Sequence, residues 1–330
     1  MAGNTATRTY TIKKRKIPKV GEIVNYTPNT PSTGYDLSKA KSGYIDAQTI
    51  DSTYDPTTWK IMEVDENENI TKLFGVPNSS QSKVFFMGSI GYNNGVYLLN
   101  DICKSRYGNA SLGATARSLN IEDIESRMNS RGIAARNAYK AGTVQYGTTR
   151  KYTGSNTKYP TIYAQEKYSG INVSDVADGT QVITGSVDAT AQARMNPNGK
   201  SGSDNIYTTL PKKSETTGPS KTNLTCTQTY YSRPQLSLYY DDADFYNMIF
   251  GTRKIFWLAS RYVNCDSNYS LAHFGLRDVE YGNLSGMYLF YTNGTSYGIG
   301  YWLAPVVSLG SGVQIKSGSG TTSDPYAIGK

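Results

Sequence analysis

The sequence predicts an α+β protein with a mainly antiparallel β core, two helices and a long loop-rich insertion. Short apolar runs, each bounded by polar or turn-forming residues, are typical of buried strands. Two segments between residues 93 and 128 carry apolar residues at helical spacing. The composition, with 32 Gly, 28 Tyr and only 18% charged residues, is typical of a chain rich in strands and loops.

Residues 1–20 are predicted to form an extended basic arm. Residues 1–19 hold six of the eight net positive charges and no acid, and the rest of the chain is close to neutral. A nucleic-acid-binding domain shows a basic face within its fold, so we do not expect nucleic acid as a partner. The alternation in Arg8-Thr9-Tyr10-Thr11-Ile12 suits a strand that joins a neighbouring copy, which would make a homo-oligomer; a solvated terminus is the alternative.

Strands are predicted in the first part of the globular region. Residues 20–26 and 59–64 alternate between apolar and polar side chains, residues 70–74 return as a hairpin, and residues 84–87 form a further apolar run. Residues 28–55 are rich in Pro, Ser, Thr and Gly and are predicted to be a long loop.

Two helices should follow these strands. Asn93 or Asn94 is expected to cap the first helix, which ends near Tyr107-Gly108. Asn120 is expected to cap the second, with Glu122 and Asp123 in its first turn, where the helix dipole favours acids. The alternative that this acidic pair is catalytic is weaker than cap chemistry.

Residues 130–222 are predicted to be an insertion lobe of loops and short strands. Gly, Ser, Thr, Asn and Lys dominate there, and residues 181–184 are one candidate strand. Loops of this length are uncommon unless they are functional or mobile. After the lobe, residues 224–231 are expected to form a strand and residues 239–250 a short aromatic helix.

Residues 255–309 carry the most informative pattern in the chain. Apolar runs open and close the stretch at residues 255–259 and 305–309, and Phe274-Gly275-Leu276 lies between them. The remainder is mostly Tyr, Asn, Ser, Gly, Asp and Thr. Such loops on a rigid frame are typical of antibody-like binding surfaces, because Tyr supplies stiff contact area and Ser, Gly and Asn supply adaptable hydrogen bonds.

A family resemblance rests on residues 91–129 and on the runs FWLASR, FGLR and PVVSL. These resemble the C-type lectin-like fold in its calcium-independent form, as in formylglycine-generating-enzyme-like domains and phage and gut Firmicutes surface proteins. The resemblance covers roughly residues 56–316. It implies a C-type lectin-like domain at 21–316 that includes the lobe 130–222, followed by a tail at 317–330. The chain departs from the family at Trp302-Leu303-Ala304, where relatives usually place Arg before the Pro-Val-Val run.

Some proteins of this fold are the variable proteins of diversity-generating retroelements, in which adenine-directed mutagenesis changes one C-terminal face. The resemblance implies that residues 262–301 are such a face, with Phe274, Gly275, Arg277, Gly282, Gly286, Leu289 and Gly294 as its fixed frame. The candidate ligand-binding residues are Tyr262, Asp266, Tyr269, His273, Asp278, Tyr281, Tyr288, Tyr291, Ser296, Tyr297 and Tyr301. Ordinary surface decoration of a Tyr-rich chain is the alternative.

Enzymatic functions have little support in the sequence. His273 is the single histidine, no serine lies in a G-x-S-x-G motif, and no phosphate-binding G-x-x-x-x-G-K-[ST] occurs. Cys103, Cys226 and Cys265 match neither a metal site nor the reactive pair of formylglycine-generating enzymes, so we expect reduced, mostly buried thiols. We therefore expect no catalytic residues, no cofactor and no metal.

The sequence favours a ligand- or receptor-binding protein of phage or cell-surface type, with a protein or glycan receptor on a cell surface as its partner. The alternative is a structural virion, pilus or filament subunit without a dedicated ligand site. No run approaches the roughly 18 apolar residues of a membrane span, and no apolar segment follows the N-terminal bases as in a signal peptide. We expect a cytoplasmic chain that later joins a virion or reaches the cell surface.

Overall fold

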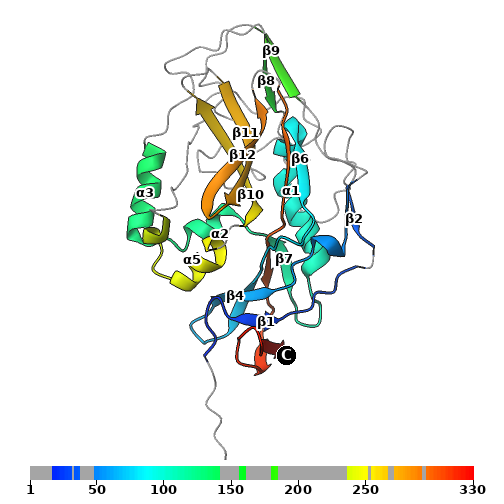
Figure 1. Cartoon of the computed structure of the whole chain (residues 1–330), viewed down its shortest axis with the longest axis vertical. Coiled ribbons are helices and arrows are strands. Elements are labelled where there is room, and N and C mark those ends of the chain that lie inside the picture. Colours follow the sequence, from blue (N-terminus) through cyan, green and yellow to red (C-terminus); the bar gives the residue numbers. More distant parts are fainter. Residues whose placement is uncertain are drawn as a thin grey trace, which may run out of the picture.

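Two β-sheets and one long helix organise the molecule, an α+β fold with mainly antiparallel strand pairing (Figure 1). The computed structural model describes residues 17–31, 33–37, 48–141, 156–160, 180–184, 236–251, 254–266, 271–291 and 295–330. Residues 1–16 of the predicted arm, the predicted strand at 224–231 and most of the lobe lie outside these ranges.

The larger sheet has seven strands in the order β15-β16-β1-β4-β5-β14-β7. Their bounds are β1 Ile23–Asn25, β4 Trp59–Val64, β5 Ile70–Gly75, β7 Thr115–Ser118, β14 Pro305–Ser308, β15 Gln314–Ser317 and β16 Tyr326–Gly329. All neighbours pair antiparallel except β1 and β16, which are parallel. The strands predicted at residues 59–64 and 70–74 are confirmed, because alternation and a polar turn define both.

The predicted C-terminal tail is part of this sheet, which corrects the sequence-based boundary at residue 316. Val24 and Asn25 pair with Tyr326 and Ala327, so the two ends of the chain's fold lie side by side (Figure 1). The Tyr326 side chain is fully buried and its hydroxyl donates to Glu22 Oε2 at 3.0 Å. This strand could not be predicted from the sequence. A polar loop precedes Tyr326, and pairing with a parallel strand so far away in sequence leaves no local pattern.

The second sheet contains β10 (Ile255–Asp266), β11 (Leu271–Glu280) and β12 (Asn283–Tyr291), all antiparallel. A short pair, β6 (Val84–Met87) and β13 (Gly298–Tyr301), lies beside it. The strand predicted at residues 84–87 is confirmed. The predicted loops on a rigid frame are mostly wrong within the described residues, because the Tyr- and Ser-rich segments continue as strands.

Helix α1 (Gly88–Tyr107) packs against strands of both sheets. The approach is close: a β-carbon on Gly95 would lie 2.3 Å from a methyl group of Leu276 on β11. The predicted cap at Asn93 or Asn94 is wrong, because the helix begins directly after β6, with Met87 at the N-cap position and no side-chain cap. Gly88 has φ 64° and allows this abrupt change from strand to helix.

The remaining helices are short. Helix α2 (Ile121–Glu125) has the predicted cap, a reciprocal capping box between Asn120 and Asp123. Helix α5 (Ala243–Phe250) confirms the predicted aromatic helix and is capped by Asp242. Helix α3 (Ser130–Ala141) and the hairpin of β8 (Asn156–Pro160) and β9 (Thr180–Thr184) lie within the predicted lobe, and β9 confirms the strand at residues 181–184.

The predicted loop at residues 28–55 is tied to the core by a buried ion pair. It contains β2 (Tyr35–Asp36), β3 (Thr49–Ile50) and the 3₁₀ helix η1 (Ser52–Tyr54); a second 3₁₀ helix, η6, spans Ser237–Tyr239. The Arg106 guanidinium, almost fully buried on α1, donates to both carboxylate oxygens of Asp55 and to the Ile50 carbonyl. Removing Asp55 from this pair should cost about 3–5 kcal/mol, because the Arg106 charge would stay buried.

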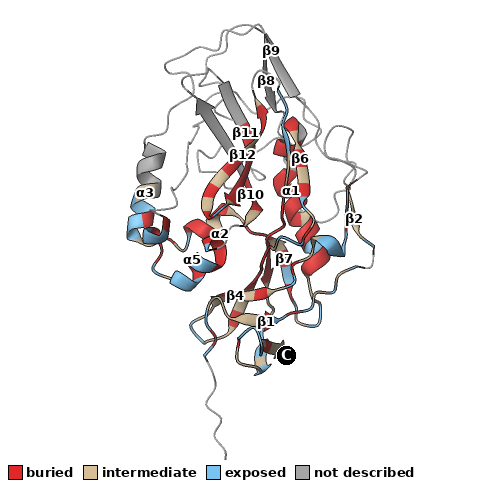
Figure 2. Cartoon of the chain, in the orientation of Figure 1, coloured by how far each residue is buried: buried red, intermediate tan, exposed pale blue. Residues whose placement is uncertain are grey.

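Buried residues form two adjoining cores, shown in red along α1 and the surrounding strands in Figure 2. Trp257 and Phe274 are fully buried, as predicted. The core also includes Val24, Tyr26 and Tyr326, which lie outside the residues 56–316 that the family resemblance covers. Among the described helices, none is both long and apolar enough to cross a membrane.

Candidate binding surface

The turn between β11 and β12 exposes one of the predicted tyrosines. Tyr281 and Gly282 have φ values of 49° and 80° and join the paired residues Glu280 and Asn283. Two residues with positive φ define a turn whose twist matches that of antiparallel strands. The Tyr281 side chain is 50% exposed.

A β-bulge near the other end of β12 re-aims its side chains. Phe274 pairs with Phe290 but Gly275 pairs with Tyr288, so β12 contains one extra residue, Leu289. Leu289 and Phe290 are both buried, which breaks the alternation of a regular strand. As a result Tyr288 and Tyr291, three residues apart, lie on the same side of the strand, with their ring centroids 6.0 Å apart.

Gly275 makes this bulge sterically possible. A β-carbon at residue 275 would lie 1.8 Å from the Met287 carbonyl oxygen, far inside van der Waals contact. The close approach of β11 and β12 therefore requires glycine at this position. The frame residue predicted from sequence thus has a specific structural role.

Tyr297 completes a group of three rings that we call the tyrosine cluster: Tyr288, Tyr291 and Tyr297. The Tyr291 and Tyr297 rings meet edge to face, with centroids 4.9 Å apart and an interplanar angle of 85°. Tyr297 is 45% exposed, whereas Tyr288 and Tyr291 are half-buried. The cluster therefore combines fixed ring geometry with accessible aromatic surface.

Backbone bonds hold the segment that carries Tyr297. The Tyr291 amide donates to the Thr295 carbonyl at 2.9 Å, and the Tyr297 amide donates to the Leu289 carbonyl at 2.8 Å. Ser296, another predicted site residue, pairs with Phe290 in an isolated bridge and is exposed. Burial raises the pKa of the Tyr291 phenol, and the neighbouring Tyr297 and Tyr288 add to this, so the phenol is neutral at physiological pH.

Strand register brings further predicted positions near the cluster. Gly275 pairs with Tyr262 on one side and with Tyr288 on the other, and His273 pairs with Asn264 and Tyr291. The backbones of Tyr262 and His273 thus neighbour those of Tyr288 and Tyr291. Asp266 ends β10 opposite Leu271. The side chains of Tyr262, Asp266 and His273, and all of Tyr269, lie outside the described part of the structure.

Asp278 and Tyr301 are corrections to the predicted site. Their exposed fractions are 1% and 3%, so neither side chain lies on a surface that a ligand reaches. Asp278 lies on β11, the central strand of its sheet. Tyr301 packs on Trp257, with the ring centroids 4.5 Å apart. Burial raises the pKa of the Asp278 carboxyl well above its usual range, and Glu280 adds to the shift.

Tyr281 is separate from the tyrosine cluster. It precedes β12, whereas Tyr288 and Tyr291 lie in the second half of that strand. At about 3.3 Å per residue, Tyr281 and Tyr288 are roughly 20 Å apart along the strand. The structure therefore divides the predicted site into two places. The frame residues Phe274, Gly275, Arg277, Gly282, Gly286 and Leu289 are all buried, as predicted; Gly294 lies outside the described residues.

Sequence reasoning missed the bulge that creates the cluster. The signal was present in Tyr288-Leu289-Phe290-Tyr291, where two consecutive apolar residues interrupt an otherwise alternating strand. It also missed Ser260, whose buried hydroxyl accepts a bond from the Ile121 amide and ties β10 to the start of α2. Such a bond between distant segments has no local sequence signature.

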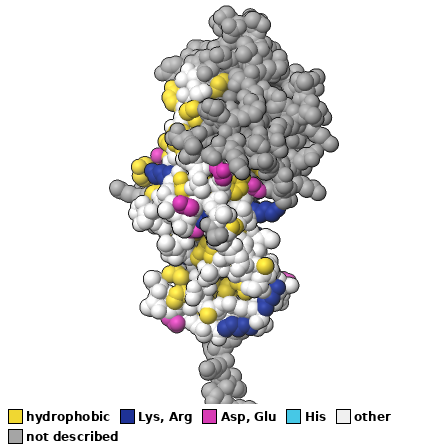
Figure 3. Space-filling model, turned by 90° about the vertical axis from the view of Figure 1, so that its right-hand side faces the viewer, with side chains coloured by type: hydrophobic (Ala, Val, Ile, Leu, Met, Phe, Trp, Pro, Cys, Tyr) yellow, Lys and Arg dark blue, Asp and Glu magenta, His cyan; other side chains and the backbone are white. Residues whose placement is uncertain are grey.

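The described residues contain no candidate metal site, and the face in Figure 3 has no charge of one sign over a large area. No group of three or more His, Cys, Asp or Glu side chains in the described ranges is placed to hold a metal ion. In the view of Figure 3, basic and acidic side chains of the described residues are interspersed. Cys103 is a buried free thiol, and burial raises its pKa. Cys226 and the side chain of Cys265 lie outside the description.

These features define a mixed α+β protein with a partly exposed aromatic cluster beside the end of a three-stranded sheet. Comparisons of the chain with protein-family models, with curated proteins and with solved structures find no match.

Proposed function

We propose that this chain is a ligand- or receptor-binding protein that displays a Tyr-, Asn- and Ser-rich face on a C-type lectin-like scaffold. The observation that carries the proposal is the tyrosine cluster: a bulge sets Tyr288 and Tyr291 side by side, next to the half-exposed Tyr297. Rigid, partly exposed tyrosines supply contact area at low entropic cost. The partner is a protein or glycan receptor on a cell surface, and the protein acts on a virion or cell surface.

The scaffold assignment is supported by the order of elements. Helices α1 and α2 precede a long insertion, and the Trp257-containing strand β10 follows it, in the order found in the family that the sequence resembles. The tested consequence is diversification of residues 262–301. Sequencing this gene in sibling strains should show amino-acid changes at the tyrosine cluster and at Tyr262 and His273, with the buried frame unchanged. Changes spread evenly along the gene would contradict diversification.

Binding itself is tested with the fluorescently labelled protein on a panel of bacterial cells and on arrayed surface glycans. Tyr291→Ala and Tyr297→Ala should each lose about 2 kcal/mol of binding free energy, roughly 30-fold in Kd. Lys316→Ala, at an exposed position on β15, is the control and should bind like the wild type. Equal binding by all three variants would place the ligand site elsewhere.

The second candidate function is a structural virion, pilus or filament subunit. It is favoured by the arm, whose residues 1–19 carry six of the eight net positive charges and include the exposed Ile17. If the arm clasps a neighbouring copy, deleting residues 1–16 should reduce the oligomer seen by light scattering. The melting temperature should change by only a few degrees, because the deletion leaves β1 and its partners intact. If the deletion leaves the oligomer unchanged, residues 1–16 have no role in assembly.

A further inference from the structure

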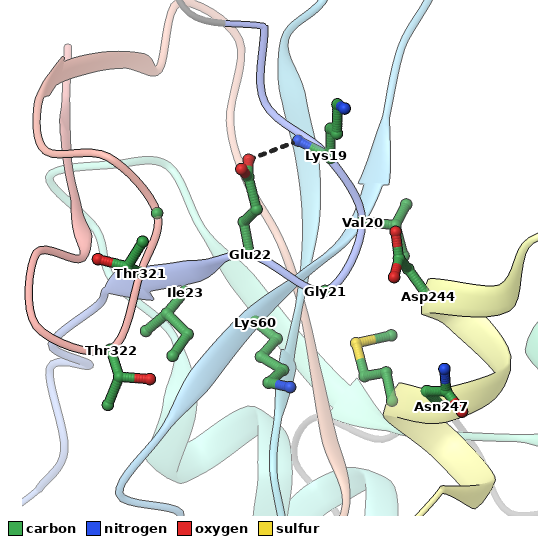
Figure 4. A pocket seen from close by; sticks show the side chains of 12 residues that line it. Lys19, Val20, Gly21, Glu22, Ile23, Lys60, Asp244, Asn247, Thr321 and Thr322 are labelled. Atoms are coloured by element: carbon green, nitrogen blue, oxygen red, sulfur yellow. Dashed lines mark hydrogen bonds between the residues drawn. The ribbon is translucent and has the colours of Figure 1, made fainter.

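A pocket of about 530 Å³ lies between β1, β4, α5 and the loop at residues 320–322 (Figure 4). Its walls come from segments far apart in the sequence, and none of them contributes to the tyrosine cluster. Val20, Ile23 and Met248 supply apolar surface. The volume lies within the range of ordinary small-molecule sites.

Three polar side chains in this pocket have no partner among the residues that the structure describes. Lys60, Asp244 and Asn247 line the pocket, and among the described residues none of the three side chains makes an ion pair or hydrogen bond. Asp244 and Asn247 are three residues apart on α5 and therefore share one face of the helix. In Figure 4, Lys60 extends between Thr322 and Asn247, and Asp244 lies beside Val20.

The Lys60 end of the pocket is electropositive. Lys254, half-buried directly before β10, has its pKa lowered to about 8, first by burial and then by the charge of Lys60. Among the described residues, neither Lys60 nor Lys254 forms an ion pair with a carboxylate. An anionic group placed at Lys60 would relieve this repulsion.

Two carboxylates line the pocket, Glu22 and Asp244, and they differ in their contacts. Glu22 is already engaged, since its carboxylate accepts from the Lys19 amide at 2.8 Å and from the Tyr326 hydroxyl at 3.0 Å. Asp244 has no such bonds and is exposed. Within the described residues, the pocket therefore offers the cation of Lys60, the anion of Asp244 and the amide of Asn247 without a partner.

We propose that this pocket binds a small zwitterion, an amino acid or a short peptide with free ends. Its ammonium group lies at Asp244, its carboxylate at Lys60, and the Asn247 amide bonds to the peptide or carboxylate group between them. Because Asp244 is exposed, solvent screens its charge, and we expect a Kd on the order of 1 mM. This site is independent of the receptor-binding function proposed above.

The test uses the dipeptide Ala-Leu, its N-acetylated form and its C-amidated form, titrated by NMR into labelled full-length protein. The wild type should bind the free dipeptide and bind each blocked form at least tenfold more weakly. Asp244→Asn should lose the discrimination against N-acetylation only. Lys60→Met should lose the discrimination against C-amidation only, because each variant removes one of the two charge contacts.

Matched controls use exposed charges away from the pocket. Glu66→Gln and Lys104→Met should bind all three peptides like the wild type, and so should Tyr297→Ala, which separates this site from the tyrosine cluster. The proposal is overturned if the wild type shows no binding at about 10 mM dipeptide. It is also overturned if blocked and free forms bind equally, or if the variants keep both discriminations. Lys60→Gln serves the same test if Lys60→Met does not fold.

Discussion

Asp278 shows how one buried side chain can make stability depend on pH. One of its carboxylate oxygens is buried without a hydrogen-bond partner among the described residues. Burial and Glu280 raise the pKa of this carboxyl, while Arg277 opposes the shift. Because the folded-state pKa lies above the unfolded value, the protonated carboxyl favours the folded state. This contribution to the free energy of unfolding is complete below about pH 4 and is lost as the pH rises through the folded pKa.

Asp278→Asn removes this titration without changing the shape of the side chain. The stability of the variant relative to the wild type should therefore grow between pH 5 and pH 8, as measured by urea unfolding at several pH values. Asp324→Asn, the same substitution at an exposed position, is the control. A difference between Asp278→Asn and the wild type that is constant with pH would show that Asp278 is ionised in the folded protein.

At the scale of elements, the bulge in β12 depends on Gly275. Gly275→Ala should destabilise the fold by about 1–3 kcal/mol, because the new methyl group collides with the Met287 carbonyl and the strands must separate. It should also weaken ligand binding, since Tyr288 and Tyr291 would move apart. Ser285→Ala, on the same strand, is the control in denaturant unfolding. A stable Gly275→Ala variant with full binding would contradict the role of the bulge.

Strand β16 gives a second element-scale prediction. Tyr326→Ala should cost about 3–5 kcal/mol of unfolding free energy, because a fully buried aromatic ring is lost between β1 and its neighbours. Tyr326→Phe should cost only about 1 kcal/mol, the hydrogen bond to Glu22. Thermal unfolding of the two variants separates ring packing from hydrogen bonding. If Tyr326→Ala leaves the stability unchanged, residues 317–330 are a tail that contributes little to the fold.

Elements defined by local chemistry could be predicted from sequence, and contacts between distant segments could not. Strand β4 and the Asn120 cap follow from alternation and from an acidic first turn. The start of α1 could not be placed, because Met87 has no capping side chain and the strand runs directly into the helix. The pairing of β1 with β16 leaves no local pattern either.

For the molecule as a whole, the candidate site could be predicted only in part, because contacts between distant segments decide which of its residues are exposed and lie together. Tyr297, a predicted binding residue, is exposed, and Gly275, a predicted frame residue, is buried. The sequence could not separate Tyr281 from the tyrosine cluster, since their distance depends on the hairpin register. The burial of Asp278 and Tyr301 could not be predicted either, because their neighbours in sequence resemble those of the exposed residues.

The central claim is that the tyrosine cluster binds while the aromatic core folds the protein. A paired measurement of melting temperature and cell-surface binding on Tyr291→Ala, Tyr297→Ala and Trp257→Ala tests it most directly. The two tyrosine variants should lose at least tenfold in binding with much less loss of stability than a core variant, because Tyr297 is exposed and Tyr291 is only half-buried. Trp257→Ala should lose about 3–5 kcal/mol of stability. Tyrosine variants that unfold, or that bind unchanged, would show that these rings are scaffold and that the working surface lies elsewhere.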